Sequence, residues 1–190
     1  MKTIEMTQEE MLQRVGRFKE LKPLAAQADP SLPLAAKDIV YSRKLLSVIG
    51  LEDGATPISS SAPIRGAAGM TMTLAVCPPG QGPELHAHVK THETFTVLRG
   101  RFEFRWNDDG RERIVLEEFD TVSVPPGVCR AFRNVGDLDG ILQVLITGGV
   151  HDMQDIDFAR QVAGQLEAID PAARAYFEKA GFTFTASKHG

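Results

Sequence analysis

The chain of 190 residues lacks the features that mark secreted, membrane-spanning or nucleic-acid-binding proteins. Its two cysteines, Cys77 and Cys129, are too far apart to indicate a disulfide framework, and we expect buried thiols in a reducing compartment. No apolar run is long enough for a signal peptide or a membrane span. The formal net charge is −4, without a long run of either sign, and gives no basic surface for nucleic acid. We therefore expect a cytoplasmic protein with a small-molecule substrate and neither nucleic acid nor a membrane as partner.

Helices are expected at both ends of the chain. Thr7 followed by Glu10 is a capping-box pattern, and the apolar spacing after it predicts an amphipathic helix over residues 8–22. The proline-rich stretch from there to residue 65 indicates an irregular arm, with one strand in the segment KLLSVIG. A C-terminal helix carries an apolar stripe, and a second short helix is expected between Asp170 and Gly181. The two apolar stripes of these end helices are larger than a small core needs, and they predict a homodimer. They are Met11, Val15 and Phe18 at one end, and Phe158, Val162, Leu166 and Ile169 at the other.

The middle of the chain is rich in β-forming residues. Seven short segments follow one another, separated by Gly, Pro or Asp, and no helix-length segment interrupts them, so we predict antiparallel strands. The sequence FEFRW-NDDGR-ERIVL predicts a hairpin in which Asp109-Gly110 supplies the positive φ of a tight turn. The seven segments are GMTMTLAVC, ETFTVL, RFEFRW, RERIVL, DTVSVP, CRAFRN and ILQVLIT.

Three of the five histidines lie within seven residues, in the segment HAHVKTH. Alternate residues of a strand share a face, so His86 and His88 can converge on one metal ion. The other two histidines, His151 and His189, stand in polar surroundings and are expected to be solvated.

The third ligand is either His92 or Glu93. With Glu93 facing inward, Phe95 and Val97 follow it into the core; with His92 facing inward, two threonines would line the core and Phe95 would be exposed. Apolar burial favours Glu93. That register requires a turn or bulge between Val89 and Thr91.

The spacing of these residues resembles the first signature of the cupin superfamily: Gly80, His86, His88, Glu93 and Gly100 match its fixed positions. The segment FDTVSVPPGVCRAFRN is similar to the second signature, with Pro125, Gly127 and Asn134 at the family's spacing. The resemblance covers roughly residues 69–147. It implies an all-β core, an antiparallel double-stranded β-helix of the jelly-roll type with flanking helices, and metal ligands at His86, His88 and Glu93. We divide the chain into an N-terminal helix and arm (1–65), the barrel (66–150) and a C-terminal helical extension (151–190).

Two positions depart from the family pattern. Phe119 stands where the family has glycine, and Arg130 stands where it has its last metal-binding histidine. A guanidinium does not coordinate metals. At about 5 Å from a divalent ion, the repulsion between the two positive charges would cost about 6 kcal/mol at an effective dielectric near 20. Arg130 would then hold a substrate anion, leave His92 to replace the ligand, or pair with Glu93 in a metal-free pocket. A one-residue slip would instead send Arg130 to solvent and Cys129 inward.

The resemblance implies a metal-dependent enzyme that acts on a small anionic or oxygenated organic molecule. A divalent transition metal (Fe, Mn, Zn or Ni, with Fe favoured) suits an oxidoreductase such as a dioxygenase, or an isomerase or lyase. Glu93 and Arg130 are the catalytic candidates, and Phe95 and Phe132 join Arg130 as candidate pocket walls. The alternative is a non-catalytic binding module without metal, in which Arg130 anchors an anion.

Overall fold

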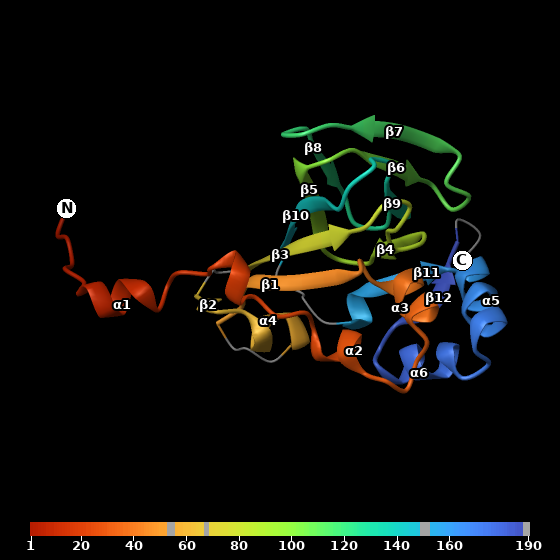
Figure 1. Ribbon diagram of the computed structural model, residues 1–190, viewed down its shortest axis with the longest axis horizontal. Coiled ribbons are helices and arrows are strands. Elements are labelled where there is room, and N and C mark those ends of the chain that lie inside the picture. The colour runs from red at the N-terminus through yellow and green to blue at the C-terminus, as the bar shows by residue number, and fades with distance from the viewer. Residues whose placement is uncertain (53–55, 67–68, 149–152, 188–190) are drawn as a thin grey trace.

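The computed structural model describes residues 1–52, 56–66, 69–148 and 153–187. Two six-stranded sheets face each other and form the barrel at the centre of the molecule (Figure 1). The first sheet has the order β2 (Ile64–Arg65), β1 (Lys44–Gly50), β3 (Met70–Cys77), β10 (Gly140–Thr147), β5 (His92–Arg99) and β8 (Thr121–Val124). The second has the order β12 (Thr183–Ala186), β11 (Ile156–Ala159), β4 (His86–His88), β9 (Arg130–Asn134), β6 (Phe102–Trp106) and β7 (Glu112–Leu116).

All seven predicted strand segments are strands, and the pairing within the barrel is antiparallel as predicted. The hairpin of β6 and β7 is confirmed, with Gly110 at φ 63° and Asn107 also at positive φ. Among the described residues, parallel pairs occur only where the flanking segments add strands, between β1 and β2 and between β11 and β12. The architecture is therefore an all-β core with flanking helices.

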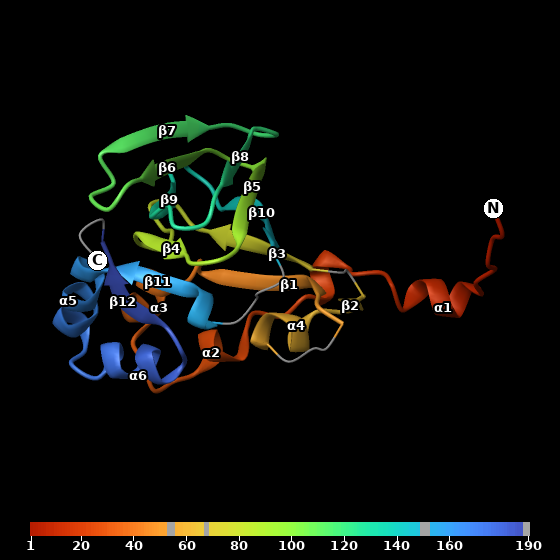
Figure 2. The same ribbon diagram turned by 180° about the vertical axis from the view of Figure 1, so that it is seen from behind.

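The helices lie outside the two sheets. They are α1 (Gln8–Leu12), α2 (Ala25–Ala28), α3 (Leu34–Val40), α4 (Pro57–Ser61), α5 (Arg160–Ile169) and α6 (Ala173–Lys179), with 3-10 turns η1 (Phe18–Glu20) and η2 (Met153–Asp155). Seen from behind, α5 and α6 lie beside β11 and β12 (Figure 2). Within the described ranges no helix combines the length and the apolar character that crossing a bilayer requires.

The predicted helix over residues 8–22 is wrong in length, because α1 ends at Leu12. Its capping box between Thr7 and Glu10 is present, but none of its residues is buried. A helix this short has little stability without packing, and α1 projects away from the barrel (Figure 1). The apolar stripe of this segment, Met11, Leu12, Val15 and Phe18, is consequently exposed.

The C-terminal stripe, in contrast, is covered by the chain itself, which corrects the expectation that it was free for a partner. Phe158, Val162 and Leu166 are fully buried in a core cluster between the outer face of the second sheet and the helices. Each such side chain contributes about 1.5–3 kcal/mol by burial. The segment is also not purely helical, because β11 and β12 join the second sheet. The domain boundaries at 65 and 150 stay a prediction.

A second core cluster fills the barrel. The side chains of β9 alternate between the two clusters: Phe132 packs inside the barrel, whereas Cys129 and Ala131 face the outer cluster. Both cysteines are buried, as predicted. A turn with a glycine at positive φ precedes β9, and another follows β5. Gly127 lies before β9 at φ 80°, and Gly100, in the turn after β5, lies at φ 91°.

Phe119 stands in a turn at φ 73°, a conformation in which a residue with a Cβ is strained. Its side chain is 77% exposed, so it gains almost nothing from packing. The phenylalanine therefore occupies a position for which glycine is the better residue.

Candidate metal centre

His86 and His88 lie side by side on β4, the short strand between β11 and β9. Both are buried, and their rings are 6.0 Å apart between centroids. After His88 the chain leaves the second sheet, turns at residues 89–91 and enters β5 of the first sheet. The register change expected between Val89 and Thr91 is this turn.

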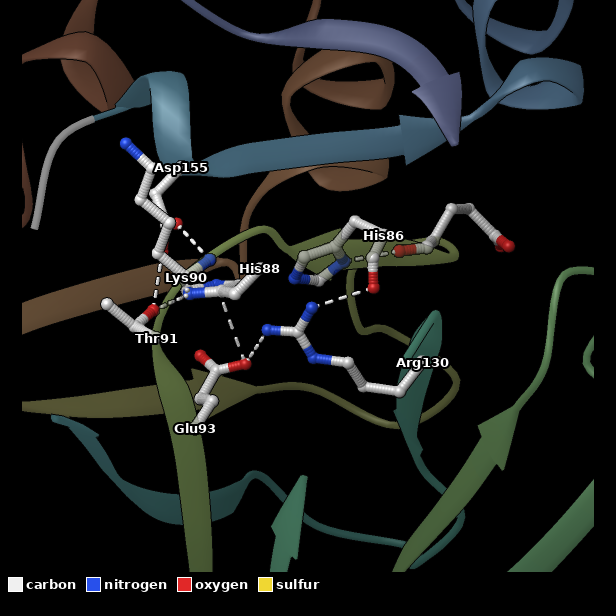
Figure 3. Close-up of polar contacts among 8 residues, drawn as sticks. His86, His88, Lys90, Thr91, Glu93, Arg130 and Asp155 are labelled. Carbon is white, nitrogen blue, oxygen red and sulfur yellow. Dashed lines mark hydrogen bonds and ion pairs between the residues drawn. The ribbon is translucent and has the colours of Figure 1, made fainter. Parts of the chain in front are cut away.

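Glu93 points inward from β5 and faces the two histidines across the barrel (Figure 3). The burial pattern of β5 places Glu93, Phe95 and Val97 inside, which confirms the register chosen from apolar burial. Nε2 of His88 lies 3.7 Å from Oε2 of Glu93, and ligand atoms of His86, His88 and Glu93 lie within 4.8 Å of one another. Among the described residues, no other group of three has this arrangement.

His92 does not join the cluster, which corrects its candidacy as a ligand. It precedes Glu93 on the same strand, so its side chain points to the opposite face and is exposed. His151 and His189 lie outside the described residues.

Arg130 is buried inside the barrel, 1% exposed, on the face of β9 that also carries Phe132. Its Nη2 donates to Oε2 of Glu93, and its Nη1 donates to the backbone oxygen of His86 at 2.7 Å. The nearby carboxylate of Glu84 instead contacts Arg105 at 3.5 Å and Arg133 at 3.3 Å. The slip that would have sent Arg130 to solvent is therefore excluded. Within the described part of the chain, Nε of Arg130 is buried and has no hydrogen-bond partner.

The protonation of His86 is fixed by its surroundings. Its Nδ1 lies 2.7 Å from the backbone oxygen of Glu84, which only accepts, so Nδ1 carries the proton and Nε2 keeps its lone pair. Burial, and then the positive charge of Arg130 and the proximity of His88, hold the pKa of His86 well below its usual value. The ring is neutral at physiological pH, as a metal ligand must be.

His88 is held by two residues that the sequence analysis did not identify, Thr91 and Asp155. Its Nδ1 lies 2.8 Å from Oγ1 of Thr91 and 3.3 Å from Oδ2 of Asp155, and Thr91 donates to that same oxygen at 2.5 Å. Burial raises the pKa of the Asp155 carboxyl, but hydrogen bonds from His88, Thr91 and the Lys90 backbone outweigh it and keep the pKa below its usual value. No sequence signal pointed to Asp155, which lies 64 residues after Thr91.

Two cavities border the site. One of about 70 Å³ is lined by His86, His88 and Glu93 together with Phe95 and Phe132, the two predicted pocket walls. The other, of about 400 Å³, is largely apolar and lies between the edge strands β7 and β8. Its walls include Arg130, Phe104, Trp106, Ile114, Val124 and Val128. Trp106 is only half-buried and lines this second cavity.

The residues present fit a divalent transition metal. Two imidazole nitrogens with free lone pairs and one carboxylate form the two-histidine, one-carboxylate set that such ions bind. Arg130 hydrogen-bonds to Glu93 but does not exhaust it, since a carboxylate has two oxygens and about four lone-pair directions. Arg130 thus uses part of the hydrogen-bonding capacity of Glu93 and leaves the lone pairs of the imidazoles free.

The segment that forms this site matches a known family. Residues 73–146 fit the model of the cupin domain. The chain therefore contains a cupin domain over these residues. Arg130 lies within the matched segment, whereas Asp155 lies beyond it. Among curated protein sequences no match was found.

Several solved structures resemble this cupin. The cupin domain of Cnp3 from Schizosaccharomyces pombe has 16% identity and a TM-score of 0.40, over 44% of this chain and 58% of that one. A predicted oxalate decarboxylase from Thermotoga maritima has 23% identity and a TM-score of 0.38, over 41% and 65%. An uncharacterised protein with a double-stranded β-helix domain from Klebsiella pneumoniae has 22% identity and a TM-score of 0.40, over 44% and 70%. The chain thus covers less than two thirds of the first two, and similarities this low say nothing about ligand or reaction.

Proposed function

We propose that this cupin is a metal-dependent enzyme that acts on a small anionic or oxygenated organic molecule, with a divalent transition metal held by His86, His88 and Glu93. The supporting observation is the fixed tautomer of the two imidazoles. Each Nδ1 faces a hydrogen-bond partner, so both Nε2 atoms are available where Glu93 also points. The proposed reaction classes are dioxygenation, isomerisation and elimination, each of which would require these Nε2 atoms to be free to bind the metal.

The metal would supply Lewis acidity or a site for O2. The chain's own residues set the conditions around it. His86 and His88 are fixed by their Nδ1 bonds, and Arg130 places a permanent positive charge beside Glu93. The apolar side chains of Phe95 and Phe132 line the 70 Å³ cavity and lower the local dielectric, so charge interactions within it are stronger than in water.

The charge balance favours an anionic or strongly polarised substrate. Arg130 and Glu93 cancel each other, Asp155 adds one negative charge, and the two imidazoles are treated as neutral. A divalent ion would therefore leave the site with one net positive charge. A carboxylate or an enolate-like oxygen would offset that charge. The 70 Å³ cavity has room for only a few non-hydrogen atoms, so a larger substrate would have to extend beyond it.

Elemental analysis of protein purified without chelator tests this proposal. We expect a transition metal in stoichiometric amount, and its loss in the His86→Ala variant. The matched control is His92→Ala, which removes an exposed histidine from the same segment and should leave the metal content unchanged. Absence of metal, even after anaerobic reconstitution with Fe(II), would refute the proposal, as would equal metal content in the two variants.

A second candidate function is the non-catalytic binding of an organic anion. The observation in its favour is the buried Arg130, whose Nε has no hydrogen-bond partner among the described residues and which lines the 400 Å³ apolar cavity. Trp106, the single tryptophan of the chain, lines the same cavity and is a built-in reporter. If this candidate holds, carboxylates with an apolar body change the fluorescence of the chelator-treated protein saturably, whereas the corresponding amides do not. No response to either series would contradict this candidate. So would a response in Arg130→Leu as strong as in the unmodified protein.

A further inference from the structure

The C-terminal extension contacts both histidines of the metal centre. Strand β11 pairs with β4 so that Ile156 lies opposite His88 and Phe158 lies opposite His86. The ring of Phe158 packs against His86 in a tilted arrangement with 5.0 Å between centroids, and the 3-10 turn before β11 places Asp155 beside His88. Both histidines of the cluster therefore rest against a segment that lies outside the matched cupin domain.

Asp155 is buried and joined to the turn between β4 and β5 by three hydrogen bonds. Its Oδ1 accepts from the backbone N–H of Lys90 at 2.7 Å, and its backbone oxygen accepts from the N–H of Val89 at 2.8 Å. Its Oδ2 accepts from the hydroxyl of Thr91. The carboxylate is thus fixed by the backbone and directed at Thr91 and His88 (Figure 3).

The direction of these hydrogen bonds determines the tautomer of His88. An ionised carboxylate only accepts, so the single hydroxyl proton of Thr91 is used by Asp155. Nδ1 of His88 then faces only acceptors, Oγ1 of Thr91 at 2.8 Å and Oδ2 of Asp155 at 3.3 Å, so it carries the proton and Nε2 is left without one. If the hydroxyl proton pointed to His88 instead, a neutral ring would carry its proton on Nε2, facing Glu93, and would not bind a metal there.

We propose that Asp155 is a positioning residue of the metal centre, acting through Thr91 to keep Nε2 of His88 free for a metal ion. This inference rests on the proposed function. It assigns a role in the site to the C-terminal extension, in addition to its packing. Groups that orient a metal-bound histidine in this way typically change metal affinity by about 10- to 100-fold when they are altered.

Asp155→Asn is the informative variant because the backbone N–H of Lys90 requires an acceptor at Oδ1. The amide nitrogen then takes the place of Oδ2 and donates to Thr91, which frees the hydroxyl proton for Nδ1 of His88. We expect the dissociation constant for Zn²⁺ or Co²⁺, measured by competition with a chromophoric chelator, to rise about 10- to 100-fold. Thr91→Val should act in the same direction, and Thr91→Ser should keep the affinity near that of the unmodified protein.

Asp157→Asn provides the matched control. Asp157 lies on β11 and accepts two hydrogen bonds from Thr185 at 2.8 Å, so the substitution weakens the same extension without touching His88. We expect a lower melting temperature and an unchanged dissociation constant. If Asp155→Asn binds metal within twofold of the unmodified protein, or if Asp157→Asn weakens binding equally, Asp155 is structural only and the inference fails.

A measurement on the metal-free protein separates this inference from the proposed function. The ¹⁵N chemical shifts of His88 report which ring nitrogen is protonated. We expect a protonated Nδ1 in the unmodified protein and a shift towards protonated Nε2 in Asp155→Asn. A protein that binds no metal yet shows this change would refute the proposed function and keep the positioning role, whereas the same tautomer in both proteins would overturn the inference.

Discussion

Replacing Arg130 by methionine tests the buried ion pair most severely. Methionine keeps the length of the side chain but leaves Glu93 without its charged partner, and the side chains of Arg130 and Glu93 are only 2% and 10% exposed. Removing one member of a buried pair costs about 3–5 kcal/mol. The backbone oxygen of His86 also loses its donor. We expect a loss of stability within this range.

Urea unfolding measures this loss. With a slope of about 2 kcal/mol per molar, the midpoint should fall by about 1.5–2.5 M. Arg133→Met is the matched control on the same strand. Arg133 contacts Glu84 at 3.3 Å with a side chain that is 44% exposed, so its loss should cost less than about 1 kcal/mol. A loss below about 1 kcal/mol for Arg130→Met would refute the claim that Glu93 depends on Arg130.

Metal should partly restore the Arg130→Met variant. A divalent ion on His86, His88 and Glu93 replaces the missing positive charge, and an ion at 100 times its dissociation constant adds about 2.7 kcal/mol of stability. At the same free metal concentration the variant should gain more than the unmodified protein, because Arg130 no longer repels the ion. An equal or smaller gain would show that the ion does not bind beside Arg130.

Three further predictions concern other parts of the molecule. Burial raises the pKa of Cys77 to about 12 and of Cys129 to about 11, so between about pH 9 and 11 the unfolded thiols lose protons that the folded protein retains. Stability should therefore fall as pH rises through this window, and fast labelling of the native thiols by Ellman's reagent at pH 8 would contradict the burial. Phe119→Gly should raise the stability by about 1 kcal/mol by relieving a positive φ, and a lower melting temperature would contradict this. The exposed apolar stripe that includes Phe18 predicts a homodimer in light scattering, which Phe18→Glu should weaken; a monomer at micromolar concentration would refute it.

The barrel could be predicted because its strands carry strong local signals. Turn residues separate the strands, and the apolar positions of β5 fix which face is buried. The flanks were predicted less well because their signals are ambiguous. Phe158 and Val162 have helical spacing, but Phe158 lies in a strand and Val162 lies in a helix. The apolar pattern after α1 continues to Leu21, yet no core covers it and the helix stops at Leu12.

The candidate site divides in the same way. His86, His88 and Glu93 lie within eight residues, so strand alternation and burial were enough to bring them together. The inward position of Arg130 followed from the register set by Pro125 and Gly127. Asp155 could not be predicted, because its contact with Thr91 depends on how β11 pairs with β4. Pairing between distant segments produces no characteristic residue spacing in the sequence.

An anomalous-diffraction experiment on crystals grown with Mn²⁺ or Zn²⁺ tests the metal centre most directly. We expect one strong peak between Nε2 of His86, Nε2 of His88 and the carboxylate of Glu93, with Arg130 still inside the barrel. No peak at this position, or a peak on the exposed His92 in its place, would refute the proposed metal centre.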